Sequence, residues 1–296
     1  MEVRAKKSLG QHFLVDQGIA QRIVAALGGR DPGAADVLEI GPGMGVLTQY
    51  LLQREDVNLK LVELDGESVD YLLTHYNGMQ GRLYQADYLK LDIHRLFEGH
   101  YSIIGNFPYN ISSQIFFKII EDRQRVDEVV CMIQKEVAER IAEGPGSKTY
   151  GILSVLLQAW YDIEYLFTVE PGAFAPPPKV RSAVIRLRRN GRTILSFAPG
   201  CKSSTYVKIS GENAPETNSQ EADNQVTVDD RLFKTIVKTA FNQRRKTLRN
   251  ALKPLLDPGK PGFAEFIASP VFDLRAERLS VDDFISLSAS CTPFIK

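Results

Sequence analysis

The sequence has little of the chemistry that builds disulfide frameworks or metal centres. Its 296 residues contain four histidines and three cysteines, which are Cys131, Cys201 and Cys291. Cysteines this few and this scattered match neither a set of disulfides nor a zinc-binding spacing. The histidines share no metal-ligand spacing with one another. The sequence therefore predicts neither a bound metal nor a small secreted domain held together by disulfides.

Long apolar runs are also missing. No run approaches the roughly 18 consecutive apolar residues that indicate a transmembrane helix. The first residues, MEVRAKKSLGQHF, begin basic, but no apolar stretch follows them as it would in a secretory signal. We therefore expect no membrane association, and the cytoplasm is the expected location.

Neither sign of charge is in excess. Lys plus Arg and Asp plus Glu each number 36, so the formal net charge of zero gives no overall electrostatic argument for a nucleic-acid partner. Positive charge nevertheless gathers locally, in Lys6–Lys7, in 179–192 (KVRSAVIRLRRNGR) and in 244–253 (RRKTLRNALK). A single basic run is ordinarily a solvated face. Three such runs around a catalytic domain favour a polyanionic partner.

Strand-like and helix-like segments alternate along the first half of the chain. The expected strands cover 36–40, 59–65, 82–87, 101–106 and 126–134, and the expected helices cover 17–27, 46–53, 67–76, 112–120 and 135–143. The segment 151–187 is expected to supply the last strands. This alternation predicts an α/β fold with a doubly wound, mostly parallel sheet, which binds ligands at the carboxyl ends of its strands.

The domain organisation follows from a change in composition. Residues 1–190 form the expected catalytic domain. The stretch GENAPETNSQEADNQ has almost nothing to bury, so residues 191–230 are expected to be a flexible linker or loop. Helical periodicity returns after it, which predicts a small C-terminal helical domain over 231–296.

Three glycines follow the first buried strand, in the segment 39–45 (EIGPGMG). Such a loop permits a tight turn and a close approach of a ligand to the backbone, which makes Gly41 and Gly43 candidate cofactor-binding residues. Nicotinamide, flavin and S-adenosyl sites all use glycine loops. The spacing G-x-G-x-G differs from the dinucleotide pattern G-x-G-x-x-G, whose loop holds a pyrophosphate at a helix N-terminus. It favours S-adenosylmethionine, which has no phosphate.

Two acidic residues occupy the ends of the next two strands. Glu63 lies at the end of the second strand, where a carboxylate can accept the hydroxyls of a cofactor ribose. Asp65 competes for that role, but alternation of side chains along a strand favours Glu63. Asp87 ends the third strand and can accept the cofactor's adenine amine. Taken alone, Asp87 would more commonly be a helix N-cap.

The segment Asn106-Phe107-Pro108-Tyr109 ends the fourth strand and carries the most specific prediction. The exocyclic amine of adenine is a poor nucleophile because its lone pair is delocalised into the ring. The Asn106 side-chain oxygen and the Phe107 backbone carbonyl can each accept one amine hydrogen and so localise that pair. Pro108 stiffens the turn, and Tyr109 offers a face for base stacking, worth roughly 1–3 kcal/mol. These residues predict methyl transfer to an adenine amine without a strong base.

Seven segments, taken in order, resemble the rRNA adenine dimethyltransferases. They are KSLGQHFL, EIGPGMGVLT, VELD, QAD, NFPYNIS, AFAPPPKVRSAVIRL and FNQRRKTLRNAL. The resemblance extends from about residue 4 to 190 and from about 231 to 256. Within that family, the pattern is most similar to the enzymes that dimethylate two adjacent adenosines near the 3′ end of small-subunit (16S) rRNA during ribosome assembly.

The resemblance implies a Rossmann-like methyltransferase fold that uses S-adenosylmethionine. The residues that it implies in the cofactor site are His12, Leu14, Gly41, Glu63, Asp87 and Asn106. His12 stands where the family often has Asn, and Phe107 stands where it often has Leu. Contacts made through the backbone would survive both changes.

The resemblance also implies how the substrate is held. Phe174 would face Tyr109 across the target base, although a core phenylalanine is an equally ordinary role for it. The residues implied in holding rRNA through its phosphates are Arg244, Arg245 and Lys246. The expected substrate is a partly assembled small subunit, and a monomer is the expected form.

Three alternatives remain open at this stage. A large-subunit rRNA methylase of the antibiotic-resistance type would share the four strand-end motifs, but the PPPKV and FNQRRKTLRNAL segments favour the small-subunit enzyme. A DNA adenine methyltransferase would use a similar motif but usually carries a larger recognition domain. A non-catalytic rRNA-binding assembly factor would not need the intact Glu63, Asp87 and Asn106.

Overall fold

The computed structural model describes residues 3, 5–6, 9–28, 35–190 and 229–296. Lys7, Ser8 and nearly all of the predicted linker at 191–230 lie outside the described residues. The chain divides into two compact units. The first unit comprises residues 1–142 and 160–190, and the second comprises residues 143–159 and 191–296.

A seven-stranded sheet forms the centre of the first unit, with strand order β4-β3-β2-β5-β6-β9-β7. Its strands are β2 (Ala35–Ile40), β3 (Val57–Glu63), β4 (Leu83–Gln85), β5 (Tyr101–Asn106), β6 (Val126–Gln134), β7 (Tyr161–Val169) and β9 (Ser182–Arg189). The first five run parallel, whereas β9 pairs antiparallel with both β6 and β7. The predicted α/β class and the mostly parallel sheet are confirmed.

Shorter elements complete this unit. Its helices are α1 (Gln17–Ala26), α2 (Thr48–Leu51), α3 (Gly66–His75), α4 (Ser112–Glu121), α5 (Lys135–Ala142), η2 (Ile93–Arg95) and η3 (Pro171–Ala173). A separate two-stranded sheet joins β1 (Phe13–Leu14) to β8 (Phe174–Ala175). Ser112 is the first residue of α4, and its hydroxyl donates to the Tyr109 carbonyl at 3.3 Å.

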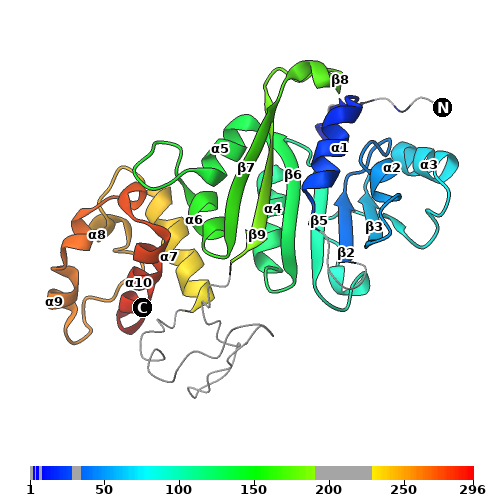
Figure 1. Cartoon of the computed structure of the whole chain (residues 1–296). Coiled ribbons are helices and arrows are strands. Elements are labelled where there is room, and N and C mark those ends of the chain that lie inside the picture. Colours follow the sequence, from blue (N-terminus) through cyan, green and yellow to red (C-terminus); the bar gives the residue numbers. More distant parts are fainter. Residues whose placement is uncertain (1–2, 4, 7–8, 29–34, 191–228) are drawn as a thin grey trace, which may run out of the picture. The chain divides into compact units, whose positions relative to one another are not determined.

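The order of the strands reverses between β2 and β5. From β2 the chain proceeds through α2 and α3 toward one edge, and from β5 it proceeds through α4 toward the other. Because parallel crossovers are right-handed, the helices that follow β2 and β5 lie on opposite faces of the sheet. In Figure 1, α4 lies behind the strands, and α1 lies in front of them. Ligands of such folds bind outside the carboxyl ends of the strands at this reversal.

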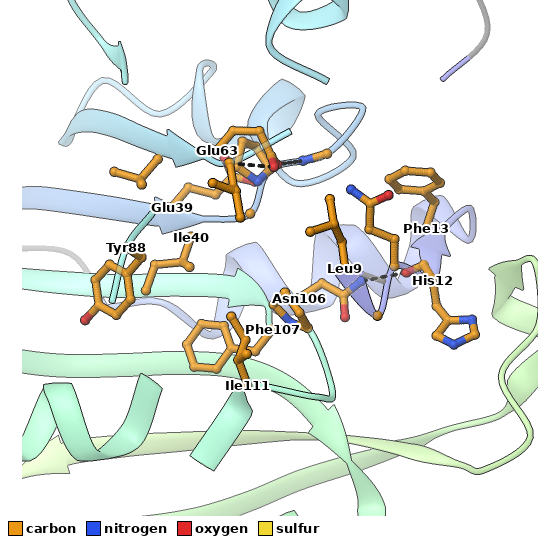
Figure 2. A pocket seen from close by; sticks show the side chains of 18 of the residues that line it. Leu9, His12, Phe13, Glu39, Ile40, Glu63, Tyr88, Asn106, Phe107 and Ile111 are labelled. Carbon is orange, nitrogen blue, oxygen red and sulfur yellow. Dashed lines mark hydrogen bonds between the residues drawn. The ribbon is translucent and has the colours of Figure 1, made fainter. Parts of the chain in front are cut away.

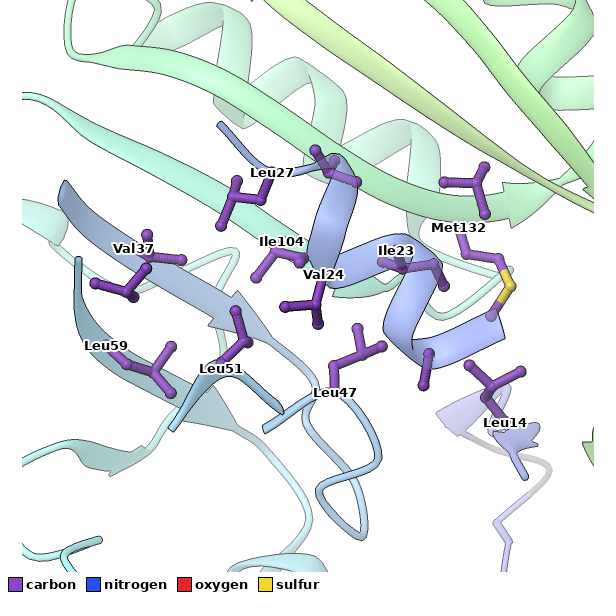
Figure 3. Packing of buried hydrophobic residues seen from close by; sticks show 14 of the residues in the cluster. Leu14, Ile23, Val24, Leu27, Val37, Leu47, Leu51, Leu59, Ile104 and Met132 are labelled. Atoms are coloured by element: carbon purple, nitrogen blue, oxygen red, sulfur yellow. The ribbon is translucent and has the colours of Figure 1, made fainter. Parts of the chain in front are cut away.

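The core of the first unit lies between α1, α2 and one face of the sheet. Alternate residues of the central strands, among them Val37, Leu59 and Ile104, meet Ile23 and Val24 of α1 (Figure 3). All are buried. The strands are buried almost continuously, as expected when helices cover both faces of a sheet. Every second strand residue faces α1, whose buried residues recur at helical spacing.

The second unit is helical. Its helices are α6 (Ile152–Gln158), α7 (Asp230–Asn242), α8 (Leu248–Ala251), α9 (Phe263–Ile267), α10 (Val281–Cys291), η5 (Pro270–Asp273), η6 (Ala276–Arg278) and η7 (Thr292–Phe294). Aromatic rings link them: Phe241 of α7 lies 6.0 Å from Tyr150 and 5.7 Å from Phe284 of α10, measured between ring centroids. This packing supports the predicted helical character of the C-terminal region.

Residues 143–159 differ from the prediction in two respects. The segment 151–187 does supply the last strands, β7 and β9, but its first part, Ile152–Gln158, is the helix α6. Residues 143–159 group with the second unit rather than with the first. Gly151 caps the start of the helix, and its N–H donates to the Ser154 hydroxyl at 3.0 Å. Five consecutive residues of α6 are buried. A short apolar run that is buried all round has no periodicity by which helix and strand could be told apart.

Among the described residues, the longest helix has 13 residues, and none is both long and apolar enough to cross a membrane.

Candidate active site

A cavity of about 300 Å³ opens in the first unit at the carboxyl ends of β2, β3 and β5. It lies where the strand order reverses, and its lining includes parts of every predicted strand-end motif as well as residues 9–14 of the N-terminal segment (Figure 2). These motifs thus meet at the carboxyl ends of the strands, where such sheets bind ligands. Among the described residues, no three His, Cys, Asp or Glu side chains gather as they would around a metal ion.

The loop after β2 depends on glycine for two reasons. Gly41, Gly43 and Gly45 have φ values of +66°, +56° and +80°, a region that other residues adopt only at a cost. A Cβ at Gly43 would lie 3.0 Å from the Phe13 ring, and one at Gly45 would lie 2.6 Å from the Tyr76 ring. The loop therefore presents bare backbone to the cavity.

Glu63 and Asp65 take different roles. Glu63 ends β3, lines the cavity and accepts the N–H groups of Gly43 at 3.0 Å and of Leu64 and Asp65 at 2.9 Å. Burial raises its pKa, although the three hydrogen bonds act in the opposite direction. Three donors leave part of a carboxylate's acceptor capacity unused. Asp65 instead bonds Lys6 and Ser68 and does not line the cavity.

Glu39 is a site residue that the sequence reasoning missed. It is 1% exposed at the end of β2 and lines the cavity. Its Oε2 accepts the Thr48 hydroxyl at 2.7 Å, and its Oε1 has no hydrogen-bond partner among the described residues. Burial raises the pKa of Glu39 to about 8, against the effect of the Thr48 bond. An acidic residue flanked by Leu38 and Ile40, two positions before the first glycine, was the available signal.

Asp87 lies two residues beyond β4 and lines the cavity. Its Oδ1 accepts the Leu89 N–H at 3.0 Å, and its Oδ2 lies 3.5 Å from the Lys90 ammonium. Both contacts come from the turn that Asp87 itself begins, so the carboxylate is held locally beside the cavity.

Asn106 is the last residue of β5, and its carboxamide is oriented. Its Nδ2 donates to the His12 carbonyl at 3.0 Å (Figure 2). Because a carbonyl can only accept, the amide nitrogen must face His12. The Oδ1 atom is thereby left for another donor.

Phe107 and Tyr109 contribute different parts to the cavity wall. The Phe107 side chain is buried against Phe116, so only its backbone is available to a ligand. The Tyr109 ring lies 5.4 Å from the His12 ring, centroid to centroid, and its hydroxyl bonds Ser182 at 2.5 Å. Burial raises the pKa of Tyr109, whereas the hydrogen bond to Ser182 acts to lower it.

Comparisons with known proteins identify the family of the chain. The sequence profile described as ribosomal RNA adenine dimethylase matches residues 2–196, about two thirds of the chain. The chain belongs to this family. It is therefore an S-adenosylmethionine-dependent rRNA adenine methyltransferase.

Two curated relatives of this dimethylase carry the name ribosomal RNA small subunit methyltransferase A. The protein of Parabacteroides distasonis is 52% identical over 97% of this chain and 93% of its own, and that of Bacteroides thetaiotaomicron is 48% identical with the same coverage. A solved dimethyladenosine transferase from Plasmodium falciparum has a TM-score of 0.66 at 22% identity, covering 95% of this chain and 98% of its own. The 23S rRNA methyltransferase ErmE has a TM-score of 0.60 at 20% identity, covering 93% and 99%.

Two predicted site residues of the dimethylase lie at the edge of its core. Leu14 lines the cavity but is buried, and Phe174 pairs with it between β1 and β8. The Phe174 side chain is 3% exposed, belongs to the same buried cluster and does not line the cavity. The structure thus does not bring Phe174 to face Tyr109, because the β1–β8 pairing turns it into the core.

The predicted rRNA-contacting residues lie in the second unit and are not equivalent. Arg244 donates to Glu277 at 3.1 Å and to the Ser147 carbonyl at 3.1 Å, so it has a structural role there. Arg245 and Lys246 are exposed, and within the described residues neither forms an ion pair. Only these two of the three present free positive charge.

Proposed function

We propose that this dimethylase methylates the N6 amines of two adjacent adenosines near the 3′ end of small-subunit rRNA. Relatives that share about half of its residues along nearly its whole length are named for the small subunit, which supports this substrate. ErmE, named for 23S rRNA, shares 20% identity and argues only for a common fold. The observation that carries the chemistry is the Asn106 carboxamide, whose nitrogen is engaged by His12 and whose oxygen is free to accept.

The cofactor site that we infer centres on three acids. The unpartnered, buried Oε1 of Glu39 is a costly group unless a cation or donor reaches it, and the ammonium of the methionine part of S-adenosylmethionine has that chemistry. Glu63 would accept a ribose hydroxyl, and Asp87 the adenine amine. The bare backbone of Gly41 and Gly43 would admit the cofactor closely, as would the backbone of His12 and Leu14.

When bound, the cofactor supplies a methyl group activated by its sulfonium. The chain's own residues act on the other reactant. Asn106 Oδ1 and the Phe107 carbonyl accept the two hydrogens of the target amine, which holds the nitrogen pyramidal with its lone pair directed outward. The Tyr109 ring stacks on the target base once it has left its helix, a step that costs a few kcal/mol. Because the methylated amine is acidic, its proton passes to water and no strong base is needed.

The remaining predictions concern the substrate as a whole. Arg245 and Lys246 would contact phosphates, with Arg244 supporting the segment that carries them. The Phe174 side chain would have to leave the core to stack on the base. The substrate is a partly assembled small subunit, and the enzyme acts on it as a monomer. Because small subunits are assembled in the cytoplasm, we expect the enzyme to be located there.

The test is methyl transfer from radiolabelled S-adenosylmethionine to small subunits that lack the modification, with large subunits and duplex DNA in parallel. Nucleoside analysis should find N6,N6-dimethyladenosine in small-subunit rRNA alone. Label in the large subunit would favour the resistance-type activity, and label in the duplex would favour a DNA adenine methyltransferase. Binding without any label would indicate a non-catalytic assembly factor.

A further inference from the structure

One segment of the chain touches both the cofactor side and the target side of the cavity. Residues 9–14, named here the N-terminal strap, all line it. At one end the strap follows Lys6, whose ammonium forms ion pairs with Asp65 and, at 3.1 Å, with Glu67. At the other end it forms β1, which pairs with β8.

Hydrogen bonds to Lys6 hold the start of the strap in a folded conformation, which we call the hook. The Lys6 carbonyl accepts the Leu9 N–H at 3.0 Å, and the Lys6 N–H donates to Gln11 Oε1 at 2.9 Å. Gly10 sits at φ +63°, where a Cβ would be 2.6 Å from Asn110 Oδ1. The hook therefore lies directly against the residue that follows Tyr109, with no room for a side chain.

The strap also decides which way the catalytic carboxamide points. The His12 carbonyl receives the Asn106 Nδ2 at 3.0 Å. Without this acceptor, rotation of the carboxamide by half a turn would present a donor, not an acceptor, to the target amine. An amine hydrogen cannot bond a donor, so the turned carboxamide would be inactive.

We propose that the N-terminal strap is a positioning element of the methyl-transfer site, with Lys6 as its anchor and the His12 carbonyl as the group that orients Asn106. This inference rests on the proposed function, because it concerns the role of Asn106 in it. Lys6 touches neither reactant and acts only through the strap.

The Lys6–Asp65 contact differs from an ordinary surface ion pair, which contributes little to folding stability. The Asp65 side chain is 4% exposed, and its N–H donates to Glu63 Oε1 at 2.9 Å. Burial tends to raise the pKa of Asp65, but the hydrogen bonds from Lys6 and Ser68 outweigh it and the pKa is lowered. A buried carboxylate that loses its cationic partner is destabilised, so the strap and the Glu63 turn depend on the same contact.

The test compares Lys6→Ala with Lys6→Arg, and Arg95→Ala is a control that removes an exposed ion pair elsewhere in the first unit. At saturating S-adenosylmethionine and small subunits, Lys6→Ala should lower kcat by about tenfold or more, since small misplacements of reacting groups are costly. Monomethyladenosine should accumulate. Lys6→Arg should retain most of kcat, and Arg95→Ala should match the wild type.

A rise in KM for S-adenosylmethionine with unchanged kcat would overturn the proposal, because it would mean that the strap only covers the cofactor. A readout independent of the substrate separates this inference from the proposed function. In ¹⁵N spectra, the Asn106 side-chain amide, assigned by its loss in Asn106→Ala, should keep its hydrogen-bonded shift in Lys6→Arg and lose it in Lys6→Ala. An unchanged amide signal in Lys6→Ala would refute the anchor whatever rRNA the enzyme modifies.

Discussion

The Thr48 hydroxyl donates to Glu39 Oε2 at 2.7 Å in a part of the first unit where neither side chain reaches solvent. The other carboxyl oxygen of Glu39 has no partner among the described residues. Burial raises the pKa of Glu39 to about 8, so the side chain is mostly protonated at neutral pH in the free enzyme. A cavity-lining acid in this state responds to pH and to a cationic ligand.

Stability should fall with rising pH because of Glu39. Its pKa in the folded chain lies above the value of 4.5 for an unperturbed Glu, so its stabilising contribution is complete below 4.5 and is lost as pH rises through about 8. Between these values the folded state binds one more proton, and the unfolding free energy declines by about 1.4 kcal/mol per pH unit from this group. Urea unfolding of wild type and Glu39→Gln from pH 5 to 9 measures the difference. Parallel curves for the two proteins would contradict the assignment.

Cofactor binding should release a proton at pH 7. If the ligand's ammonium meets the Glu39 carboxylate, the protonated side chain must ionise. Titration calorimetry with S-adenosylhomocysteine in buffers of different ionisation enthalpy should find close to one proton released by wild type and much less by Glu39→Gln. Glu136→Gln, which changes an acid outside the cavity lining, is the matched control. Equal release by all three proteins would exclude Glu39 as the source.

Much of this site was predictable because its parts are local. The carboxyl ends of parallel strands share one edge of a sheet, so placing Gly41, Glu63 and Asn106 at strand ends was enough to bring them together. Glu39 was missed because the sequence does not show that its carboxyl is buried and lacks a partner on one oxygen. Sequence spacing carries no information on partners far along the chain, such as His12 with Asn106 or Arg244 with Glu277.

Gly10→Ala should impair turnover more than stability. The new methyl group would meet Asn110 Oδ1 at 2.6 Å and would sit at φ +63°. Gly81→Ala is the matched control, because Gly81 has a φ of +77° and an added Cβ there would have no described atom within 4 Å. Both variants should lose roughly 1 kcal/mol of unfolding free energy from the backbone conformation. Only Gly10→Ala should lose kcat as well, by severalfold. Equal kcat values would mean that the close approach has no catalytic role.

Gly105→Ala should be strongly destabilising. Gly105 precedes Asn106 in β5, and an added Cβ would lie 2.6 Å from the Ile40 carbonyl oxygen of β2 and 3.1 Å from the Phe107 ring. Because Ile40 offers backbone rather than a movable side chain, the two strands must separate. Overpacking of this kind costs about 1–3 kcal/mol. Urea midpoints should therefore drop for Gly105→Ala and stay near wild type for Gly99→Ala, where an added Cβ meets no described atom within 4 Å. An unchanged midpoint for Gly105→Ala would mean that the strands adapt freely.

Substitutions of Arg244 and Arg245 should have different effects, although the two residues are adjacent in the sequence. Loss of Arg244 should lower folding stability, and loss of Arg245 should weaken rRNA binding. Arg244→Ala removes the bonds to Glu277 and to the Ser147 carbonyl, so it should lower the urea midpoint of the enzyme. Arg245→Ala and Lys246→Ala remove exposed charges and should leave that midpoint unchanged. Each should reduce the slope of log K against log salt for rRNA binding by about 1, as expected for one lost phosphate contact. If Arg245→Ala and Lys246→Ala kept the wild-type slope, the rRNA would contact a different surface, and the basic run 179–192 would be the next to test.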